Sequence, residues 1–116
     1  FAGPQKDPLR YLWAADGMVF PTLYDPCPNA VLEGMACGLG IISSPHCGAM
    51  ELLNETSGIS ISPWDHLGMA RAMELFSDPE FALKAGQAAR GNVEGLTLKA
   101  MGDELLKLYQ SLVAKN

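Results

Sequence analysis

The sequence contains no long hydrophobic run and no sorting segment. None of its apolar stretches reaches the ~18–20 residues that a helix needs to cross a lipid bilayer. It also lacks the basic start, apolar centre and small-residue cleavage site of a secretory signal peptide. No transmembrane segment is therefore predicted.

Cysteine, histidine and basic residues are scarce. Cys27, Cys37 and Cys47 are odd in number and form no Cys-x-x-Cys pair, which argues against a disulfide framework or a zinc site and favours small apolar fillers in a reducing compartment. His46 and His66 are isolated and belong to no metal-ligand pattern. With 8 Lys and Arg against 13 Asp and Glu, the net charge is −5. Electrostatics alone thus make the chain a poor nucleic-acid binder.

What is present is enough for one domain. The chain has 116 residues, of which 48% are hydrophobic, so it can bury a core. Phe1 and Ala2 are typical of the end of a strand, and Gly3-Pro4 of the turn after it. Because a natural domain seldom starts inside an element, we expect a fragment of a longer protein or a processed product.

Helical and strand-like segments alternate along the chain. Asp-Pro pairs at 7–8 and 78–79 predict helix starts, because Asp supplies a capping oxygen and Pro suits the first helical position. Short apolar segments predict strands at 18–20 and 39–43, with a weaker one at 58–62. Helices are predicted at 7–15, 29–37, 48–53, 65–76, 78–91 and from 97 onward, the last with an apolar stripe of Leu98, Met101, Leu105, Leu108 and Leu112.

This alternation predicts an α/β fold. Strands that are apolar throughout and separated by helices indicate a parallel sheet covered on both faces. Right-handed crossovers then give a doubly wound, Rossmann-like layout. Three strands are few for such a sheet, so we expect a partial one whose other strands lie upstream of Phe1.

The segment between strand 18–20 and helix 29–37 is the candidate site, because ligands of doubly wound sheets bind beyond the carboxyl ends of the strands. Pro28 is predicted at the first helical position, which leaves the amides of Asn29, Ala30 and Val31 without partners inside the helix. Such amides and the helix dipole together suit a phosphate.

Two acids accompany these amides. Glu33 lies four residues after Asn29, so both share the helix face opposite the apolar one. Glu33 can accept two hydrogen bonds from a ribose diol, or it is simply a solvated residue on an exposed face. Asp25 can accept hydrogen bonds from sugar hydroxyls, or it caps a helix that has Pro26 at its first position.

The segment 14–39, AADGMVFPTLYDPCPNAVLEGMACGL, resembles the signature of GT-B, family 4 glycosyltransferases. That family shows Ala-Asp before the strand, Pro-Ser/Thr at its end, a Glu-x7-Glu pair and a Glu-Ala-Met-Ala-x-Gly run. Asp25-x7-Glu33 and EGMACG at 33–38 are the counterparts. Downstream, GAME at 48–51 resembles the Gly-x-x-Glu motif and SPWD at 62–65 the Pro-x-Asp motif, so the resemblance covers nearly the whole chain. The Tyr-Asp-Pro form at 24–26 resembles bacterial transferases of the lipopolysaccharide core.

The resemblance implies a role for each matching residue. Glu33 matches the carboxylate that binds the nucleotide ribose, and Asp25 the one that contacts the donor sugar near its anomeric carbon. Cys27, Pro28 and Asn29 match a loop whose backbone contacts the sugar. Asn29 and Ala30 match the helix start that faces the diphosphate.

Three positions depart from the family pattern. Asp25 replaces the usual first Glu and shortens the reach by one methylene. Pro28 stands where many members have Gly and removes one N–H donor. Gly40 stands where Pro is common, which affects only a strand start.

The implied reaction is transfer of a sugar, with retained anomeric configuration, from a nucleoside diphosphate sugar to a hydroxyl acceptor in bacterial glycolipid or polysaccharide synthesis. No cofactor or metal is expected: the donor is a co-substrate, with a UDP-sugar favoured. The glycolipid or saccharide acceptor belongs to an N-terminal domain that, like the upstream phosphate-binding Arg and Lys, lies outside residues 1–116.

We therefore expect residues 1–116 to be the C-terminal part of the donor-binding domain, inactive alone. The full-length protein is expected to be cytoplasmic, with peripheral attachment to the inner face of the membrane left open. The alternative is a non-enzymatic Rossmann-like module that binds nucleotide or phosphate.

Overall fold

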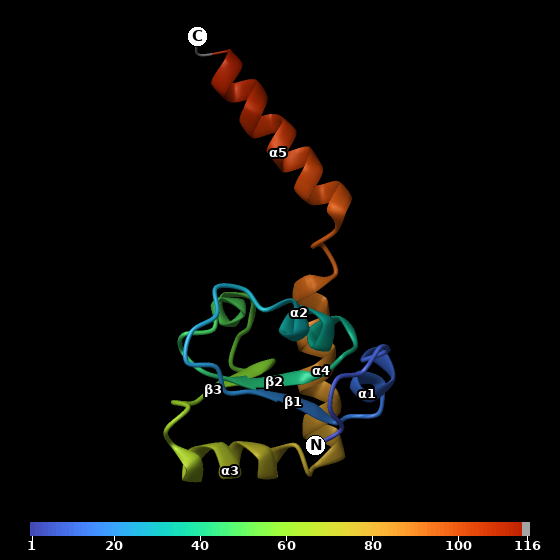
Figure 1. Ribbon diagram of the computed structural model, residues 1–116, viewed down its shortest axis with the longest axis vertical. Coiled ribbons are helices and arrows are strands. Elements are labelled where there is room, and N and C mark those ends of the chain that lie inside the picture. Colours follow the sequence, from blue (N-terminus) through green and yellow to red (C-terminus); the bar gives the residue numbers. More distant parts are fainter. Residues whose placement is uncertain (115–116) are drawn as a thin grey trace.

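The computed structural model describes residues 1–114 and shows a three-stranded parallel sheet of order β1-β2-β3 between helices (Figure 1). Helix α2 and the 3₁₀ helix η1 lie over one face and α3 over the other. The predicted α/β fold with a parallel sheet is confirmed. The elements are α1 (Leu9–Trp13), β1 (Gly17–Phe20), α2 (Asn29–Ala36), β2 (Gly40–Ser43), η1 (Gly48–Leu52), β3 (Gly58–Ser60), α3 (His66–Leu75), α4 (Pro79–Val93) and α5 (Leu98–Val113).

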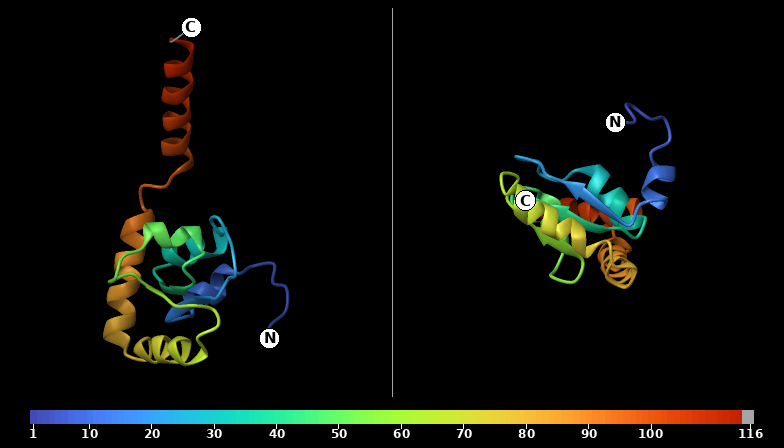
Figure 2. Two further views of the ribbon diagram at one scale, coloured as in Figure 1. Left: turned by 90° about the vertical axis from the view of Figure 1, so that its left-hand side faces the viewer. Right: turned by 90° about the horizontal axis from the view of Figure 1, so that it is seen from below.

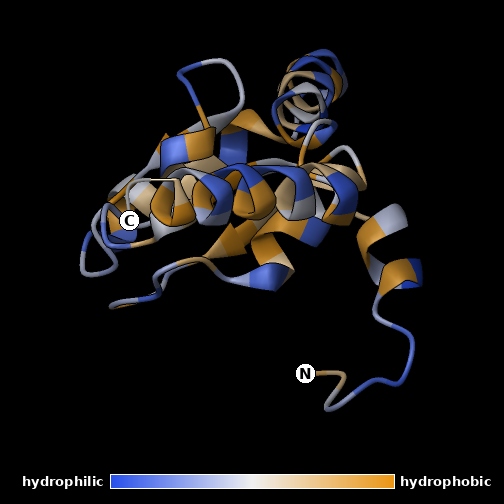
Figure 3. Ribbon diagram, turned by 90° about the horizontal axis from the view of Figure 1, so that it is seen from above, coloured by the Kyte–Doolittle hydropathy of each residue, from blue (hydrophilic) through white to orange (hydrophobic). Residues whose placement is uncertain are grey.

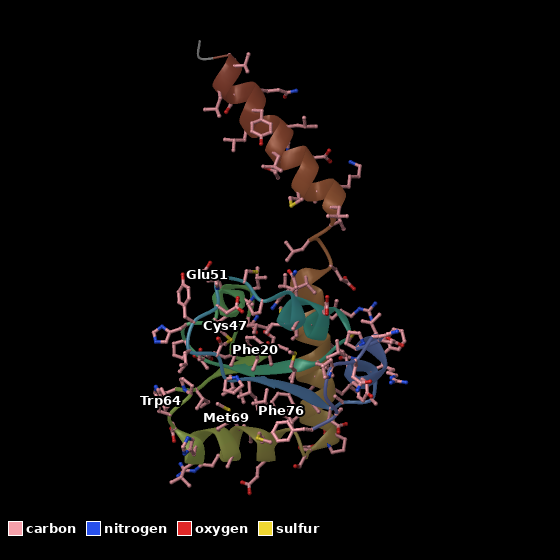
Figure 4. All side chains as sticks on the ribbon, in the orientation of Figure 1. Phe20, Cys47, Glu51, Trp64, Met69 and Phe76 are labelled. Carbon is pink, nitrogen blue, oxygen red and sulfur yellow. The ribbon has the colours of Figure 1, made fainter. Side chains whose placement is uncertain are left out.

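Strand β2 is the centre of the core. All four of its residues are buried, as its mostly apolar sequence predicts for a strand covered on both faces. Successive side chains of a strand point to opposite faces. Ile41 accordingly packs in a cluster with Val31 and Met35 of α2, whereas Ile42 packs with Phe76 and others beside α3. Figure 4 shows Phe76 and Met69 on the α3 side of the sheet and Cys47 on the other.

Helix α4 packs closely against the start of β2, where glycines leave the necessary room. A Cβ atom on Gly86 would lie 1.8 Å from the carbonyl oxygen of Gly38. A Cβ on Gly40, a departure from the family pattern noted above, would lie 2.7 Å from the Cβ of Ala85. Ala85, in the first half of α4, packs in the cluster of Ile42. Ala89, in the second half, packs in the cluster of Ile41.

The helix ends follow local sequence signals in most cases. Gly38, with φ of +83°, ends α2 in a Schellman motif: its amide donates to the Met35 carbonyl at 2.9 Å, and the Leu39 amide to the Gly34 carbonyl at 3.0 Å. Asp65 caps α3 by accepting from the Gly68 amide at 2.8 Å. The side chains of Asp78 and Thr97 cap α4 and α5 in the same way.

Two predictions near the N-terminus are wrong. Helix α1 begins at Leu9, with Pro8 at the cap position and no side-chain cap, so Asp7 does not serve as one. Phe1 and Ala2 are exposed and form no strand. In both cases a local signal lacks the tertiary contacts that would fix it, because Phe1, Ala2 and Asp7 are all exposed.

Helix α5 stands away from the rest of the molecule (Figures 1 and 2). None of its residues is buried, although the predicted apolar stripe is present along it. Figure 3 shows hydrophobic and hydrophilic residues interspersed along this helix. Exposed ion pairs, such as Lys99 with Asp103 at 2.7 Å, add only a few tenths of a kcal/mol, roughly 0.3–0.5 each.

Candidate functional site

The carboxyl ends of the strands open into a pocket of about 570 Å³. It lies between the loop after β1, the loop after β2 and η1. Asp25 and Glu51 are its acidic residues, and Tyr24 and His46 contribute aromatic rings. We call it the Asp25 pocket. It is lined by Tyr24, Asp25, Pro26, Pro45, His46, Cys47, Gly48, Met50, Glu51 and Ser60.

Main-chain hydrogen bonds hold the two loops together. The Asp25 amide donates to the His46 carbonyl at 3.1 Å, and the Gly48 amide donates to the Asp25 carbonyl at 2.8 Å. These bonds form an isolated parallel bridge between Asp25 and Cys47. One step earlier, the buried Ser43 hydroxyl donates to the Phe20 carbonyl at 2.6 Å. The wall of the pocket is therefore an extension of the sheet beyond its regular strands.

Gly48 is required where the loops meet. A Cβ atom on it would lie 1.6 Å from the carbonyl oxygen of Pro26, well inside any permitted contact. The oxygen is backbone and cannot rotate away. The first residue of the Gly-x-x-Glu pattern is thus explained by close approach of two loops.

Asp25 has a half-buried position in this wall. Its Oδ1 accepts a hydrogen bond from the Cys27 amide at 3.2 Å, and Oδ2 has no protein partner in the described part of the chain. Residues 26–28 are not helical, so the alternative that Asp25 caps a helix starting at Pro26 is wrong. The carboxylate instead closes a local turn and keeps one oxygen for a ligand.

The N-terminus of α2 offers two free amides, not the three predicted. Pro28 is extended and stands at the cap position, so the helix begins at Asn29. The Val31 amide donates to the Pro28 carbonyl at 3.0 Å, and the Val31 side chain is 0% exposed. Val31 therefore offers a ligand neither an amide nor a surface. Asn29 and Ala30 are exposed, and within residues 1–114 their amides have no partner.

Glu33 lies one turn along α2 on the exposed face. The predicted division of this helix is confirmed: Asn29 and Glu33 are exposed, whereas Val31 and Met35 are 0% exposed beneath them. Glu33 does not line the Asp25 pocket, so the two acids do not share this cavity. Cys27 is exposed and Pro28 is buried, and neither lines the pocket.

Asp25 is the one lining residue of this pocket that the sequence singled out as a site residue, and His46 and Glu51 are the ionisable residues that it missed. His46 follows β2 and Glu51 lies on η1, and both reach the site because parallel strands end at one edge of the sheet. Figure 4 shows Glu51 and Cys47 together above the sheet. The Gly-x-x-Glu motif at 48–51, taken together with the loop after the first strand, is the signal in the sequence that could have indicated Glu51.

Residues 1–114 show neither a candidate metal site nor a helix that could span a membrane. Within residues 1–114 there is no group of three or more His, Cys, Asp or Glu side chains placed to hold a metal ion. Cys27, Cys37 and Cys47 are free thiols. Over the same range, no helix has both the length and the apolar character that a bilayer span requires.

Comparison with known proteins identifies the family. Residues 1–78 match the family model described as "Glycosyl transferases group 1". The glycogen synthase of Mycobacterium tuberculosis is 34% identical over 84 residues, covering 71% of this chain and 20% of that protein. The lipopolysaccharide core biosynthesis glycosyltransferase LpsE of Rhizobium meliloti is 30% identical over 115 residues, covering 96% of this chain and 34% of that protein.

A solved structure agrees with these relatives. The sucrose-phosphate synthase of Thermosynechococcus elongatus superposes with a TM-score of 0.81 at 30% identity, over 91% of this chain and 27% of that one. The three-stranded parallel sheet thus matches part of a GT-B glycosyltransferase fold. The chain spans 20–34% of the length of these curated relatives. With two thirds of its residues matched by the family model, this chain belongs to the group 1 glycosyl transferases.

Proposed function

We propose that residues 1–116 are the C-terminal part of the donor-binding domain of a retaining, family 4 glycosyltransferase. The parent enzyme would transfer a sugar from a nucleoside diphosphate sugar to a hydroxyl acceptor. The observation that carries this proposal is the pairing of two features four to five residues apart: the free amides of Asn29 and Ala30, and the half-buried carboxylate of Asp25. An anion and a polyol can therefore be held side by side.

The nucleotide half of the donor belongs at α2. The amides of Asn29 and Ala30 point out of the helix start and, with the positive end of the helix dipole, attract the diphosphate. Glu33 is on the same exposed face one turn later, about 6 Å along the axis from Asn29. Its two oxygens accept hydrogen bonds from the ribose hydroxyls. With the upstream Arg and Lys that the resemblance implies, no metal is needed to neutralise the diphosphate.

The sugar belongs on the side of the Asp25 pocket. Oδ2 of Asp25, which is left free by the bond from the Cys27 amide to Oδ1, accepts a hydroxyl hydrogen bond and orients the ring. The family resemblance assigns the backbone of Cys27 and Pro28 to contacts with the sugar. In the transfer, the bond from the anomeric carbon to the diphosphate oxygen breaks and a bond to the acceptor oxygen forms. Negative charge grows on the leaving diphosphate, where fixed helix amides stabilise it without reorganising.

The wider assignments rest on the relatives. A UDP-sugar is the favoured donor, and the acceptor is a glycolipid or saccharide bound chiefly by the N-terminal domain of the parent. The match over 96% of the chain to LpsE supports bacterial glycolipid or polysaccharide synthesis, with the parent in the cytoplasm or on the inner face of the membrane. We expect the 116-residue chain by itself to give no donor-dependent turnover, and turnover by the purified chain would contradict this.

Substitution of Glu33 in the full-length parent tests the proposal. Glu33→Gln keeps the shape but removes the charge, and hydrogen bonds to charged groups contribute roughly 1.5–3 kcal/mol. We expect the KM for the UDP-sugar to rise about 10- to 150-fold, measured by UDP release. Glu55→Gln is the matched control, because Glu55 is also exposed but lies in the turn before β3.

Two outcomes would contradict the proposal. Equal effects of both substitutions would remove the ribose role of Glu33. A parent that binds UDP normally but shows no transfer to any hydroxyl acceptor would favour the alternative, a non-enzymatic module whose α2 amides bind nucleotide or phosphate.

A further inference from the structure

A second hollow adjoins the Asp25 pocket. It has a volume of about 350 Å³ and lies between the loops that follow the three strands. It shares Pro45 and His46 with the Asp25 pocket, so the two meet at the loop after β2. We call it the Trp64 pocket. It is lined by Leu23, Pro45, His46, Ser62, Pro63 and Trp64.

Trp64 is the residue that needs an explanation. Its side chain is 74% exposed, although a tryptophan has a large apolar area to bury. Its backbone is nevertheless fixed: the Asp65 amide donates to the Ser62 carbonyl at 2.9 Å, which closes a turn with Pro63 and Trp64 at its centre. Asp65 then caps α3. The ring is thus presented by a rigid turn, so little ordering of the backbone opposes binding there.

We propose that the Trp64 pocket is a saccharide subsite for the acceptor, next to the donor sugar in the Asp25 pocket; this inference rests on the proposed function. The negative face of an indole ring attracts the polarised C–H groups on the face of a pyranose. His46 and Ser62 supply hydrogen-bonding groups for its hydroxyls, and Leu23 supplies an apolar wall.

The Trp64 pocket is lined by both apolar and polar residues, which favours a sugar over an apolar partner as its ligand. A purely apolar surface pressed on Trp64 would bury the imidazole of His46 without a hydrogen-bond partner, which is unfavourable. A pyranose satisfies the ring and the imidazole together. Because His46 lines both hollows, a sugar in the Trp64 pocket also lies beside a sugar in the Asp25 pocket, which is the placement that transfer between them requires.

The two tryptophans of the chain provide the test. Trp13 is 71% exposed on α1 and lines neither hollow, so it is a matched control for Trp64. We would titrate ¹⁵N-labelled chain with maltotriose, lactose and chitotriose, and separately with UDP and UDP-glucose. At least one saccharide is expected to shift the indole N–H signal of Trp64 and the amide of His46 while leaving Trp13 unchanged. Trp64→Ala should abolish the His46 shift, and Trp13→Ala should keep it.

Each contrary result has a defined meaning. No shift of Trp64 with any of the three saccharides, or equal shifts of Trp64 and Trp13, would overturn the subsite. A Trp64 shift produced by UDP-glucose but by none of the free saccharides would assign the pocket to the donor and overturn its acceptor role. UDP alone is expected to shift Asn29 and Ala30, so failure of the donor site is seen separately from failure of the Trp64 pocket.

Discussion

Substitution of Gly48 by Ala tests how the site is built. The added Cβ would lie 1.6 Å from the Pro26 carbonyl oxygen, so the loops after β1 and β2 must move apart. That movement stretches two hydrogen bonds, from the Gly48 amide to Asp25 at 2.8 Å and from the Asp25 amide to His46 at 3.1 Å. Each contributes about 0.5–1.5 kcal/mol net. Overpacking adds roughly 1–3 kcal/mol.

We therefore expect Gly48→Ala to lower the free energy of unfolding by about 2–4 kcal/mol, since the loops relieve part of the clash as they separate. This is a large share of the ~5–15 kcal/mol typical of a domain. Urea unfolding followed by circular dichroism measures it, with the Tm falling by roughly 8–16 °C at ~4 °C per kcal/mol.

Gly91→Ala is the control for this measurement. Gly91 lies exposed inside α4, and a Cβ on it meets nothing within 4 Å. Alanine there should raise stability by about 0.5–1 kcal/mol, because glycine is a poor helix former. The reasoning would be refuted if Gly48→Ala unfolded at the wild-type urea concentration, or if Gly91→Ala lost as much stability as Gly48→Ala.

Two further substitutions probe the local structure. Asp65→Ala removes the cap of α3 and should cost about 1 kcal/mol in thermal unfolding, whereas Asp7→Ala should cost nothing because Asp7 caps no helix; equal losses would contradict this. Ser43→Ala removes the hydrogen bond to the Phe20 carbonyl and should cost about 0.5–1 kcal/mol, near the lower end because that carbonyl also accepts from the Thr22 amide. Urea unfolding measures it, and a loss above about 3 kcal/mol would show that the carbonyl is left without a partner.

The sequence predicts those features that depend on neighbouring residues. The caps at Asp65, Asp78 and Thr97 and the glycine end of α2 all follow from side chains and φ preferences within a few positions. The burial of β2 follows from a short, mostly apolar segment, whose length suits a strand and not a helix. The same local reasoning placed Pro28 one position too far into α2, which is within the usual uncertainty of a helix boundary.

The composition of the pocket is beyond such local reasoning. Asp25 and Glu33 are paired by their match to the Glu-x7-Glu pattern, which lies within one short segment. The acid that lines the pocket with Asp25 is Glu51, which is separated from it by a whole strand. Their proximity depends on the parallel register of β1 and β2 and on the bridge from Asp25 to Cys47. Long-range pairing of this kind has no signature in a single segment.

The loop after β1 links the two halves of the proposed donor site. Asp25 is fixed to the loop after β2 by main-chain bonds, and three residues later Pro28 leads directly into α2. Between them, Pro26 and Pro28 restrict φ and so reduce the freedom that the loop would otherwise lose on binding. The Asp25 carboxylate and the free amides of α2 therefore keep a fixed separation before any ligand arrives. For a transfer reaction, such preorganisation matters more than tight binding of the substrate in its ground state. Preorganised groups stabilise the developing charge of the transition state without first having to move.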